Sequence, residues 1–259
     1  MSEQTQPNVA MVVMAHPDDA EFGAGGTVAR WVKEGWEVYY VIVSDGASGG
    51  PDDATEVGPE QRLVWAGIRQ QEQLAAARVL GVKEVIFLNY PDGMVTPSLE
   101  LRRELVRCYR RYKPLRLICQ SPERNWFPQM FLGRYHPDHL AAGQAALAAV
   151  YPASQNPWDF PELLQEGFLP HRVLEVYITG SPNPNFPVDI SETVDLKIEA
   201  LKAHTTQTGP DFEGMGERIR KNVAQMGEKY NLAAAEVFHR VENGGLPAPV
   251  PAPAPEKSN

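Results

Sequence analysis

The sequence predicts an α/β protein with a Rossmann-like, doubly wound and mostly parallel sheet. Three observations predict this fold. Apolar runs rich in β-branched residues alternate with longer segments of helical periodicity. Each of four early strands is separated from the next by a helix, which implies parallel pairing through right-handed crossovers. The 259 residues are 43% hydrophobic and 22% charged, which is enough to build one large α/β domain.

The first expected strand is "VAMVVMA", residues 9–15. It is apolar, rich in valine, and bounded by Pro7-Asn8 and His16-Pro17. Further runs of the same kind predict strands at 37–44, 84–90, 115–121 and 172–180, and an edge strand opens the stretch 189–207.

Helices are expected between the strands. The segment "GGTVARWVKEG" has apolar residues spaced by about four and ends at Gly35, a residue type that commonly stops helices. Similar patterns predict helices at 59–80, 98–113 and 136–152, a helix that follows a cap-like Ser191, and a final helical region at 216–241.

Residues 244–259, "GGLPAPVPAPAPEKSN", are rich in proline and alanine and cannot bury a core. We expect a disordered or polyproline tail there. Residues 1–243 are therefore expected to form a single α/β domain.

Charge and hydropathy disfavour several classes of protein. The formal net charge of −9 repels phosphate backbones, so we expect no nucleic-acid partner. No apolar stretch is long enough to cross a bilayer, and the start "MSEQTQPNVA" does not resemble a secretory signal. We therefore expect a cytoplasmic protein without a membrane span. Cys108 and Cys119 are expected to be buried thiols.

Polar residues follow four of the expected strands at the points where these strands end. The segments are 16–19, the glycine-rich loop after residue 44, 91–93 and 136–139. Ligands of doubly wound sheets bind beyond the carboxyl ends of the strands, at a switch point. We therefore expect all four segments on one rim of the sheet.

The segments "HPDD" (16–19) and "HPDH" (136–139) each combine imidazole and carboxylate groups. Catalytic zinc sites use about three such ligands and leave one position for water. A mixed set of this kind favours zinc or a related first-row ion over calcium or magnesium. A neighbouring carboxylate then acts as the base for the attacking water. Spacing alone does not divide these roles between Asp18 and Asp19, and either could instead cap the following helix.

Other chemistries fit less well. The glycines of "FGAGGTVARW" do not match the G-x-G-x-x-G pattern of dinucleotide-binding proteins, and the chain has neither a Walker A loop nor a G-x-S-x-G elbow. A non-catalytic sugar- or nucleotide-binding module is the alternative from a different class, and it predicts no bound metal.

Five stretches carry a resemblance to a known family: "AHPDDAEFGAGGTVARW", "RQQEQLAAARVLGV", "NYPDG", "HPDHLAAG" and "KIEALKAHTTQ". Together they resemble the LmbE-like, or PIG-L, family of zinc-dependent de-N-acetylases, over about residues 9 to 240. The resemblance implies a hydrolase that removes the acetyl group from an N-acetylglucosamine-type sugar. It also implies Zn²⁺, or Fe²⁺ in the cell, as cofactor, and a homo-oligomer such as a trimer or hexamer.

The resemblance also implies roles for the matching residues. His16, Asp19 and His139 would hold the zinc ion, and Asp18 would be the base. His136, as an imidazolium, would support the oxyanion. The remaining implied roles belong to Asp138, which would orient His136, and to four substrate-binding residues: Arg69, Glu72, His204 and Gln207. Arg69 and Glu72 could instead form only a structural ion pair.

The chain departs from many relatives at Ala47, where they carry a glutamate after the second strand. Substrate choice is therefore open between an N-acetylglucosamine-type sugar and another amide, such as a chito-oligosaccharide or a sugar–thiol conjugate. Three aromatic residues after the fourth strand are candidates for stacking on a sugar: Trp126, Phe127 and Phe131.

Overall fold

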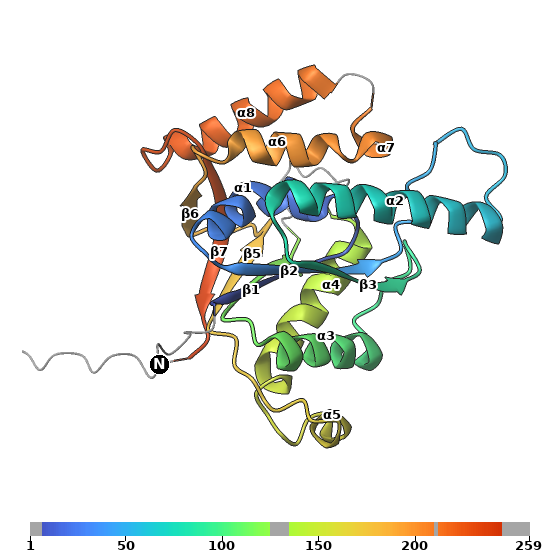
Figure 1. Ribbon diagram of the computed structural model, residues 1–259, viewed down its shortest axis with the longest axis vertical. Helices are drawn as coiled ribbons and strands as arrows, with labels where there is room; N and C mark the ends of the chain where they lie inside the picture. The colour runs from blue at the N-terminus through green and yellow to red at the C-terminus, as the bar shows by residue number, and fades with distance from the viewer. Residues whose placement is uncertain (1–6, 125–134, 210–211, 245–259) are drawn as a thin grey trace, which may run out of the picture.

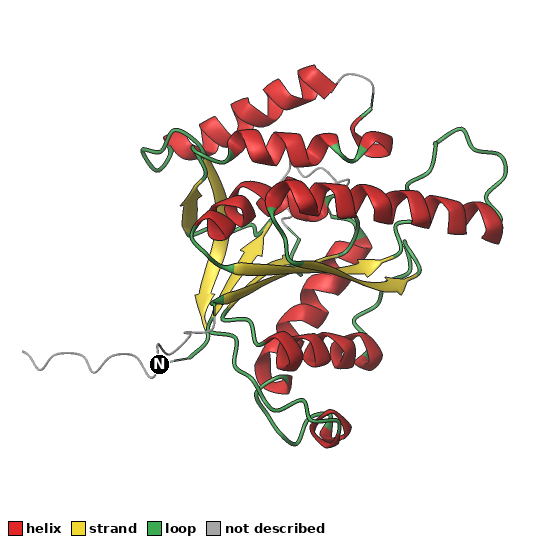
Figure 2. Ribbon diagram, viewed as in Figure 1, coloured by secondary structure: helices red, strands yellow, loops and turns green. Residues whose placement is uncertain are grey.

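The computed structural model describes residues 7–124, 135–209 and 212–244 (Figure 1). A central sheet is covered by helices on both faces, which confirms the doubly wound α/β prediction. Helices α1, α2, α6 and α8 lie on one face, and α3, α4 and α5 lie on the other (Figures 1 and 2). Two separate apolar clusters fill the space between the sheet and these two layers.

The sheet has seven strands in the order β3-β2-β1-β4-β5-β7-β6. The five strands from β3 to β5 pair in parallel, and β7 runs antiparallel between β5 and β6. The direction of strand addition reverses between β1 and β4, so the switch point lies there. The strands are β1 Val9–Met14, β2 Glu37–Ser44, β3 Glu84–Tyr90, β4 Arg116–Gln120, β5 Glu175–Thr179, β6 Phe186–Asp189 and β7 Ala235–Glu242.

The helices largely follow the expected periodicity. Gly81 ends α2 in the left-handed conformation, with φ of 77°, as the helix-stop rule predicts. None of the helices in the described ranges combines the length and apolar character that crossing a bilayer requires. The helices are α1 Asp19–Lys33, α2 Pro59–Leu80, α3 Leu99–Tyr112, α4 Pro137–Ala148 followed by a kinked segment Ala149–Ala153, α5 Pro161–Gln165, α6 Val194–Lys202, α7 Thr205–Thr208 and α8 Phe212–Glu228.

Helix α1 begins at Asp19, six residues earlier than the pattern indicates, and therefore contains the glycines that the pattern places before the helix. A Cβ atom on Gly26 would lie 2.7 Å from Ile190 Cδ1, and one on Gly23 would lie 3.2 Å from Thr179 Oγ1. These glycines therefore allow α1 to pack closely against its neighbours. Close helix packing therefore accounts for the glycines in this segment, and no phosphate-binding loop is needed to explain them.

The helical prediction for 216–241 is wrong in its second half. Helix α8 ends at Glu228, and the chain reverses through Asn231, which has φ of 58°. The alanine-rich run that follows has high helix propensity, yet Ala235–Glu242 forms β7 between two other strands. Sheet pairing and burial of Phe238 outweigh local propensity here. Ser191 is also not a helix cap, since Thr193 directly precedes α6 and Ser191 donates to Asp189.

A buried ion pair connects α1, α6 and β7. Lys197 Nζ lies 2.6 Å from Glu236 Oε1 and donates to the Phe22 carbonyl at 2.7 Å. Glu236 also accepts from the backbone N–H groups of Gly26 and Thr27, at 3.0 and 2.7 Å. This network anchors the helix whose first turn carries Asp19. The tail predicted at 244–259 lies outside the described residues, apart from Gly244.

We predict that Lys197→Met lowers the free energy of unfolding by about 3–5 kcal/mol, because it leaves Glu236 buried without its cationic partner. Urea unfolding followed by circular dichroism measures this change. Lys202→Met on the exposed face of the same helix is the control and should change stability by about 0.5 kcal/mol or less. Equal effects of the two substitutions would contradict a stabilising role for the pair.

Candidate metal centre and active site

Segments far apart in the sequence meet at the carboxyl ends of β1, β3 and β4. His16 follows β1, and Asp19 begins α1. His139 lies in the first turn of α4, and Asp92 follows β3. All of them lie at one rim of the sheet, as expected from the order of the polar segments, and His16, Asp19 and His139 follow β1 and β4, the strands that flank the switch point.

The side chains of His16, Asp19 and His139 bring their polar atoms close together at a candidate metal site. His16 Nδ1 lies 3.1 Å from His139 Nε2 and 3.2 Å from Asp19 Oδ2. His139 Nε2 lies 3.2 Å from Asp19 Oδ1. Ligand atoms of a tetrahedral zinc ion, bound at about 2.0–2.1 Å, lie about 3.3 Å from one another. The donor types and their spacing therefore fit a zinc-like cation.

The opposite nitrogen of His16 is held by two carboxylates. His16 Nε2 lies 3.1 Å from Asp92 Oδ1 and 3.2 Å from Asp138 Oδ2. Asp138 also accepts from the N–H groups of Gly93 and Val95, and Asp92 accepts from that of Ser48. These anchored carboxylates orient the ring so that Nδ1 points at Asp19 and His139.

Among the described residues, two further groups also have ligand atoms within 4.8 Å of one another: His16, His136 and His139, and His16, Asp92 and Asp138. The Asp138 side chain is 0% exposed, whereas that of His139 is 25% exposed. A catalytic metal needs an open position for water. The accessible His139 side of His16 therefore suits such a metal better than the enclosed Asp92 and Asp138 side.

Protonation of the cluster depends on whether a cation is bound. Burial lowers the pKa of His16, but hydrogen bonds to Asp138, Asp19 and Asp92 outweigh it and raise that pKa to about 12. Burial raises the pKa of Asp19, but both histidines hold it well below its usual range. The doubly protonated His16 ring thus balances the carboxylates in the metal-free protein. A metal at Nδ1 takes the place of one of these protons.

The expected imidazolium form of His136 differs from the contacts observed. His136 Nδ1 accepts a hydrogen bond from the Asp138 backbone N–H at 3.2 Å, so this nitrogen carries no proton. Burial and the nearby charge of His16 lower the pKa of His136. The ring is therefore neutral, with its proton on Nε2. The Asp138 carboxylate contacts His16, so it orients His16 instead of the expected His136.

Asp18 has an unusual backbone conformation, with φ of 95°. Such conformations cost about 1–3 kcal/mol and cluster at functional sites. Its side chain makes no cap hydrogen bond to α1, which excludes the capping alternative for this residue. Arg69 Nη2 lies 3.2 Å from Asp18 Oδ2 and also donates to the Pro17 carbonyl. Burial and the Asp19 charge raise the pKa of Asp18 to about 7, although Arg69 acts against this.

All four expected substrate-binding residues make contacts within the protein. Glu72 accepts from Thr205 and from the N–H and hydroxyl of Thr206, and it does not pair with Arg69. His204 is 0% exposed and lies 3.1 Å from Glu21, so it is enclosed in the protein. Gln207 donates to the Gly49 carbonyl at 2.9 Å. These contacts hold α7 and the loop after β2 against α2.

Arg69, the fourth of these residues, is also buried and contacts Asp18. The loop after β2 passes directly over it, since a Cβ atom on Gly49 would lie 1.8 Å from Arg69 Nη1. The structure therefore places Arg69 beside Asp18 and beneath this loop.

A pocket of about 400 Å³ opens beside Asp19 and His139. Phe22, on the first turns of α1, is 43% exposed there. The other lining residues are Gly23, Gln120, Ser121, Glu123, Tyr135, Leu140, Thr179 and Gly180. Trp126, Phe127 and Phe131, the expected stacking residues, lie outside the described residues.

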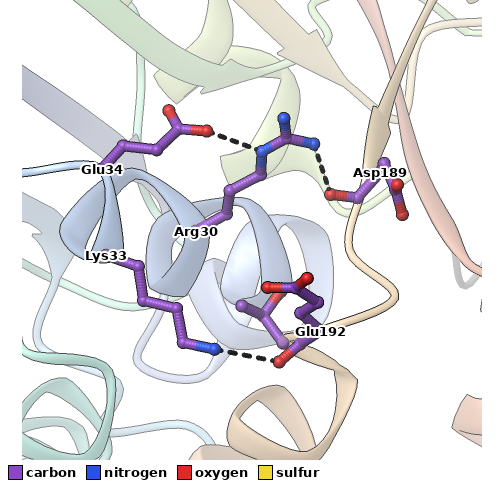
Figure 3. Close-up of a pocket in the computed structure, with 6 residues that line it drawn as sticks. Arg30, Lys33, Glu34, Asp189 and Glu192 are labelled. Atoms are coloured by element: carbon purple, nitrogen blue, oxygen red, sulfur yellow. Dashed lines mark hydrogen bonds and ion pairs between the residues drawn. The ribbon is translucent and has the colours of Figure 1, made fainter.

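Figure 3 shows another polar cavity, of about 260 Å³, at the far end of α1. Its cations already have partners: Arg30 donates to Glu34 and to the Asp189 carbonyl, and Lys33 donates to the Glu192 carbonyl. No histidine lines it. It therefore offers no site comparable to the cluster around His16.

Sequence reasoning assigned no role to Asp92, Gln73 or Glu21. Asp92 lies in the turn "PDG" after β3, so its position at the rim was a usable signal. Gln73 and Glu21 lie inside helices and are fully buried. Their contact with each other joins positions 52 residues apart, and no local pattern indicates it.

Comparison with known proteins is consistent with this geometry. The family model described as GlcNAc-PI de-N-acetylase, PIG-L, matches residues 11–150. Diacetylchitobiose deacetylase of Thermococcus kodakarensis is 29% identical over 214 residues, covering 83% of this chain and 75% of the relative. The 1D-myo-inositol 2-acetamido-2-deoxy-alpha-D-glucopyranoside deacetylase of Actinosynnema mirum is 28% identical, with coverages of 93% and 98%.

A solved structure shows the same similarity. N,N'-diacetylchitobiose deacetylase from Pyrococcus horikoshii, in complex with an inhibitor, superposes with a TM-score of 0.79 and 30% identity. The match covers 91% of this chain and 84% of the other.

We predict that Asp18→Asn stabilises the metal-free protein more at pH 8 than at pH 5. In wild type, the unfolded chain ionises Asp18 near pH 3.8, whereas the folded protein does so near pH 7, so stability falls as the pH rises through this range. Asparagine at position 18 does not ionise, so the variant does not lose stability in this way as the pH rises. The advantage of the variant should grow by on the order of 2 kcal/mol between the two pH values. Urea unfolding with a chelator present measures it, and a constant difference would contradict the raised pKa.

Proposed function

Since this chain belongs to the PIG-L, or LmbE-like, family of de-N-acetylases, we propose that it hydrolyses the N-acetyl amide of an N-acetylglucosamine-type sugar with the aid of a bound metal ion. One observation carries the proposal. His16 Nδ1 and His139 Nε2 lie 3.1 Å apart, and each lies 3.2 Å from a different carboxylate oxygen of Asp19, next to Asp18 in the sequence and at the edge of an open pocket.

We propose His16, Asp19 and His139 as the metal ligands, with Zn²⁺ as the ion, or Fe²⁺ in the cell. Such an ion, when bound, acidifies a water molecule and polarises the amide carbonyl. The two carboxylates on Nε2 of His16 keep its ring in the binding orientation.

Asp18 is the proposed general base. Its carboxylate takes the proton of the attacking water and then delivers a proton to the nitrogen that leaves as the amine. In the metal-free protein, burial and the Asp19 charge raise the pKa of Asp18 to about 7, so its carboxylate binds a proton more readily than an ordinary aspartate does. Arg69 keeps one oxygen of this carboxylate fixed.

His136 is the proposed oxyanion donor. Because Nδ1 accepts from the Asp138 N–H, the neutral ring carries its proton on Nε2 and can donate a hydrogen bond to the developing negative charge. The neutral His136 ring therefore donates this hydrogen bond without placing an imidazolium charge beside the proposed metal ligands.

The similarity to deacetylases of diacetylchitobiose and of a glucosaminyl-inositol supports an acetylated amino sugar as substrate. Another amide, such as a longer chito-oligosaccharide or a sugar–thiol conjugate, is the alternative at the same site. Acetate release from a panel of these compounds distinguishes them. Size-exclusion chromatography with light scattering tests the trimer or hexamer that we propose for the assembly.

We predict that Asp18→Ala retains the metal but lowers kcat by about 10²–10⁴, because it removes the base without removing a ligand. His139→Ala should lose both metal and turnover. Metal analysis by mass spectrometry, beside a fluorescamine assay for the free amine, measures both properties. Full activity of the Asp18 variant would refute the proposed base.

We predict that dialysis against a chelator abolishes turnover and that Zn²⁺ restores it. A non-catalytic binding module predicts neither effect. Apo-protein that keeps its activity would contradict the metal-dependent reaction, and circular dichroism before and after dialysis controls for unfolding.

A further inference from the structure

We infer that Gln73 is a positioning residue for Asp18, a role that rests on the proposed function of Asp18 as base. Gln73 Oε1 accepts a hydrogen bond from the Asp18 backbone N–H at 2.9 Å. The carbonyl of the same peptide unit, that of Pro17, accepts from Arg69 Nη2. Two side chains of α2, one helical turn apart, thus hold both polar groups of a single peptide.

This peptide determines where the Asp18 carboxylate points. The φ angle of Asp18 describes its rotation relative to the peptide unit that precedes it, and it is 95° here. Aspartate seldom adopts a positive φ unless its surroundings impose one. Rotation of the Pro17–Asp18 peptide would return φ to negative values and redirect the side chain. The contacts from Gln73 and Arg69 oppose that rotation.

With Asp18 N–H and the Glu21 carboxylate as its partners, the side chain at position 73 needs one acceptor and one donor, and a primary amide provides both. Gln73 Nε2 donates to Glu21 Oε1 at 3.0 Å, while its Oε1 accepts from Asp18. Glu21 Oε2 in turn lies 3.1 Å from His204 Nε2, and all three side chains are 0% exposed. A carboxylate at position 73 would face that of Glu21, and an aliphatic side chain would leave both partners without a hydrogen bond.

The first test uses Gln73→Leu in the full-length, zinc-loaded protein, with N,N'-diacetylchitobiose as substrate. We expect kcat to fall about a hundredfold, with KM changed by about twofold or less and metal content unchanged. Gln71→Leu, at an exposed position on the same helix, should retain wild-type kcat. Combined with Asp18→Asn, Gln73→Leu should lower the residual rate by about twofold or less, because the carboxylate that Gln73 positions is already absent. A further hundredfold loss in that background would overturn the inference.

The second test exchanges the two partners. Gln73→Glu and Glu21→Gln should each lower kcat, whereas the double variant keeps one donor and one acceptor at each contact. We expect the double variant to recover at least about tenfold over either single variant. Failure to recover in a folded double variant would refute the hydrogen-bond pattern as the cause.

Crystal structures of the metal-free wild type and Gln73→Leu give a readout independent of activity. We expect Asp18 to leave the positive φ region in the variant, and an unchanged φ would overturn the inference. Absence of acetate release by the wild type would instead refute the proposed function, while the crystallographic comparison would still test the positioning.

Discussion

Four carboxylates, those of Asp18, Asp19, Asp92 and Asp138, gather near the imidazole rings of His16 and His139. Such a concentration of negative charge is unfavourable away from water unless cations compensate it. In the metal-free protein, the protonated ring of His16 and the guanidinium of Arg69 supply that charge. A metal ion at the proposed site would offer the same compensation and would displace a proton. The acidic cluster therefore supports the proposed metal site.

Helix α2 contacts the candidate site from one face. Arg69, Glu72 and Gln73 share this face and contact, respectively, the proposed base Asp18, the segment carrying α7, and the peptide before Asp18. Residues that the resemblance assigns to substrate binding therefore make contacts within the protein that connect α2 to Asp18 and to α7. The middle of α1 is fixed by the Lys197–Glu236 pair through Gly26 and Thr27, so the helix that presents Asp19 is anchored beyond its first turn. A rigid frame of this kind suits a site that must keep a strained aspartate in place.

The proposed chemistry and the choice of substrate depend on different parts of the chain. The metal ligands and Asp18 lie at the ends of core strands and at the starts of α1 and α4. The pocket beside them is lined by side chains of α1, β4 and the segments after β4 and β5. Ala47 lies in the loop after β2, which is held to α7 through Gln207 and Gly49. The departure at Ala47 therefore concerns this loop, whose Ser48 N–H also holds Asp92 beside His16, while none of the proposed metal ligands lies in it.

The sequence by itself determined the strand–helix alternation and placed the two His/Asp segments at one rim, because parallel strands bring their carboxyl ends to a common edge. Family resemblance was needed to separate the roles of Asp18 and Asp19. Only the tertiary structure decided that residues 235–242 form a strand, since their partners β5 and β6 are distant in the chain. It alone also assigned Asp138 to His16, enclosed His204 against Glu21, and joined Gln73 to Asp18. Such contacts depend on the packing of whole helices, and a local residue pattern contains no information about that packing.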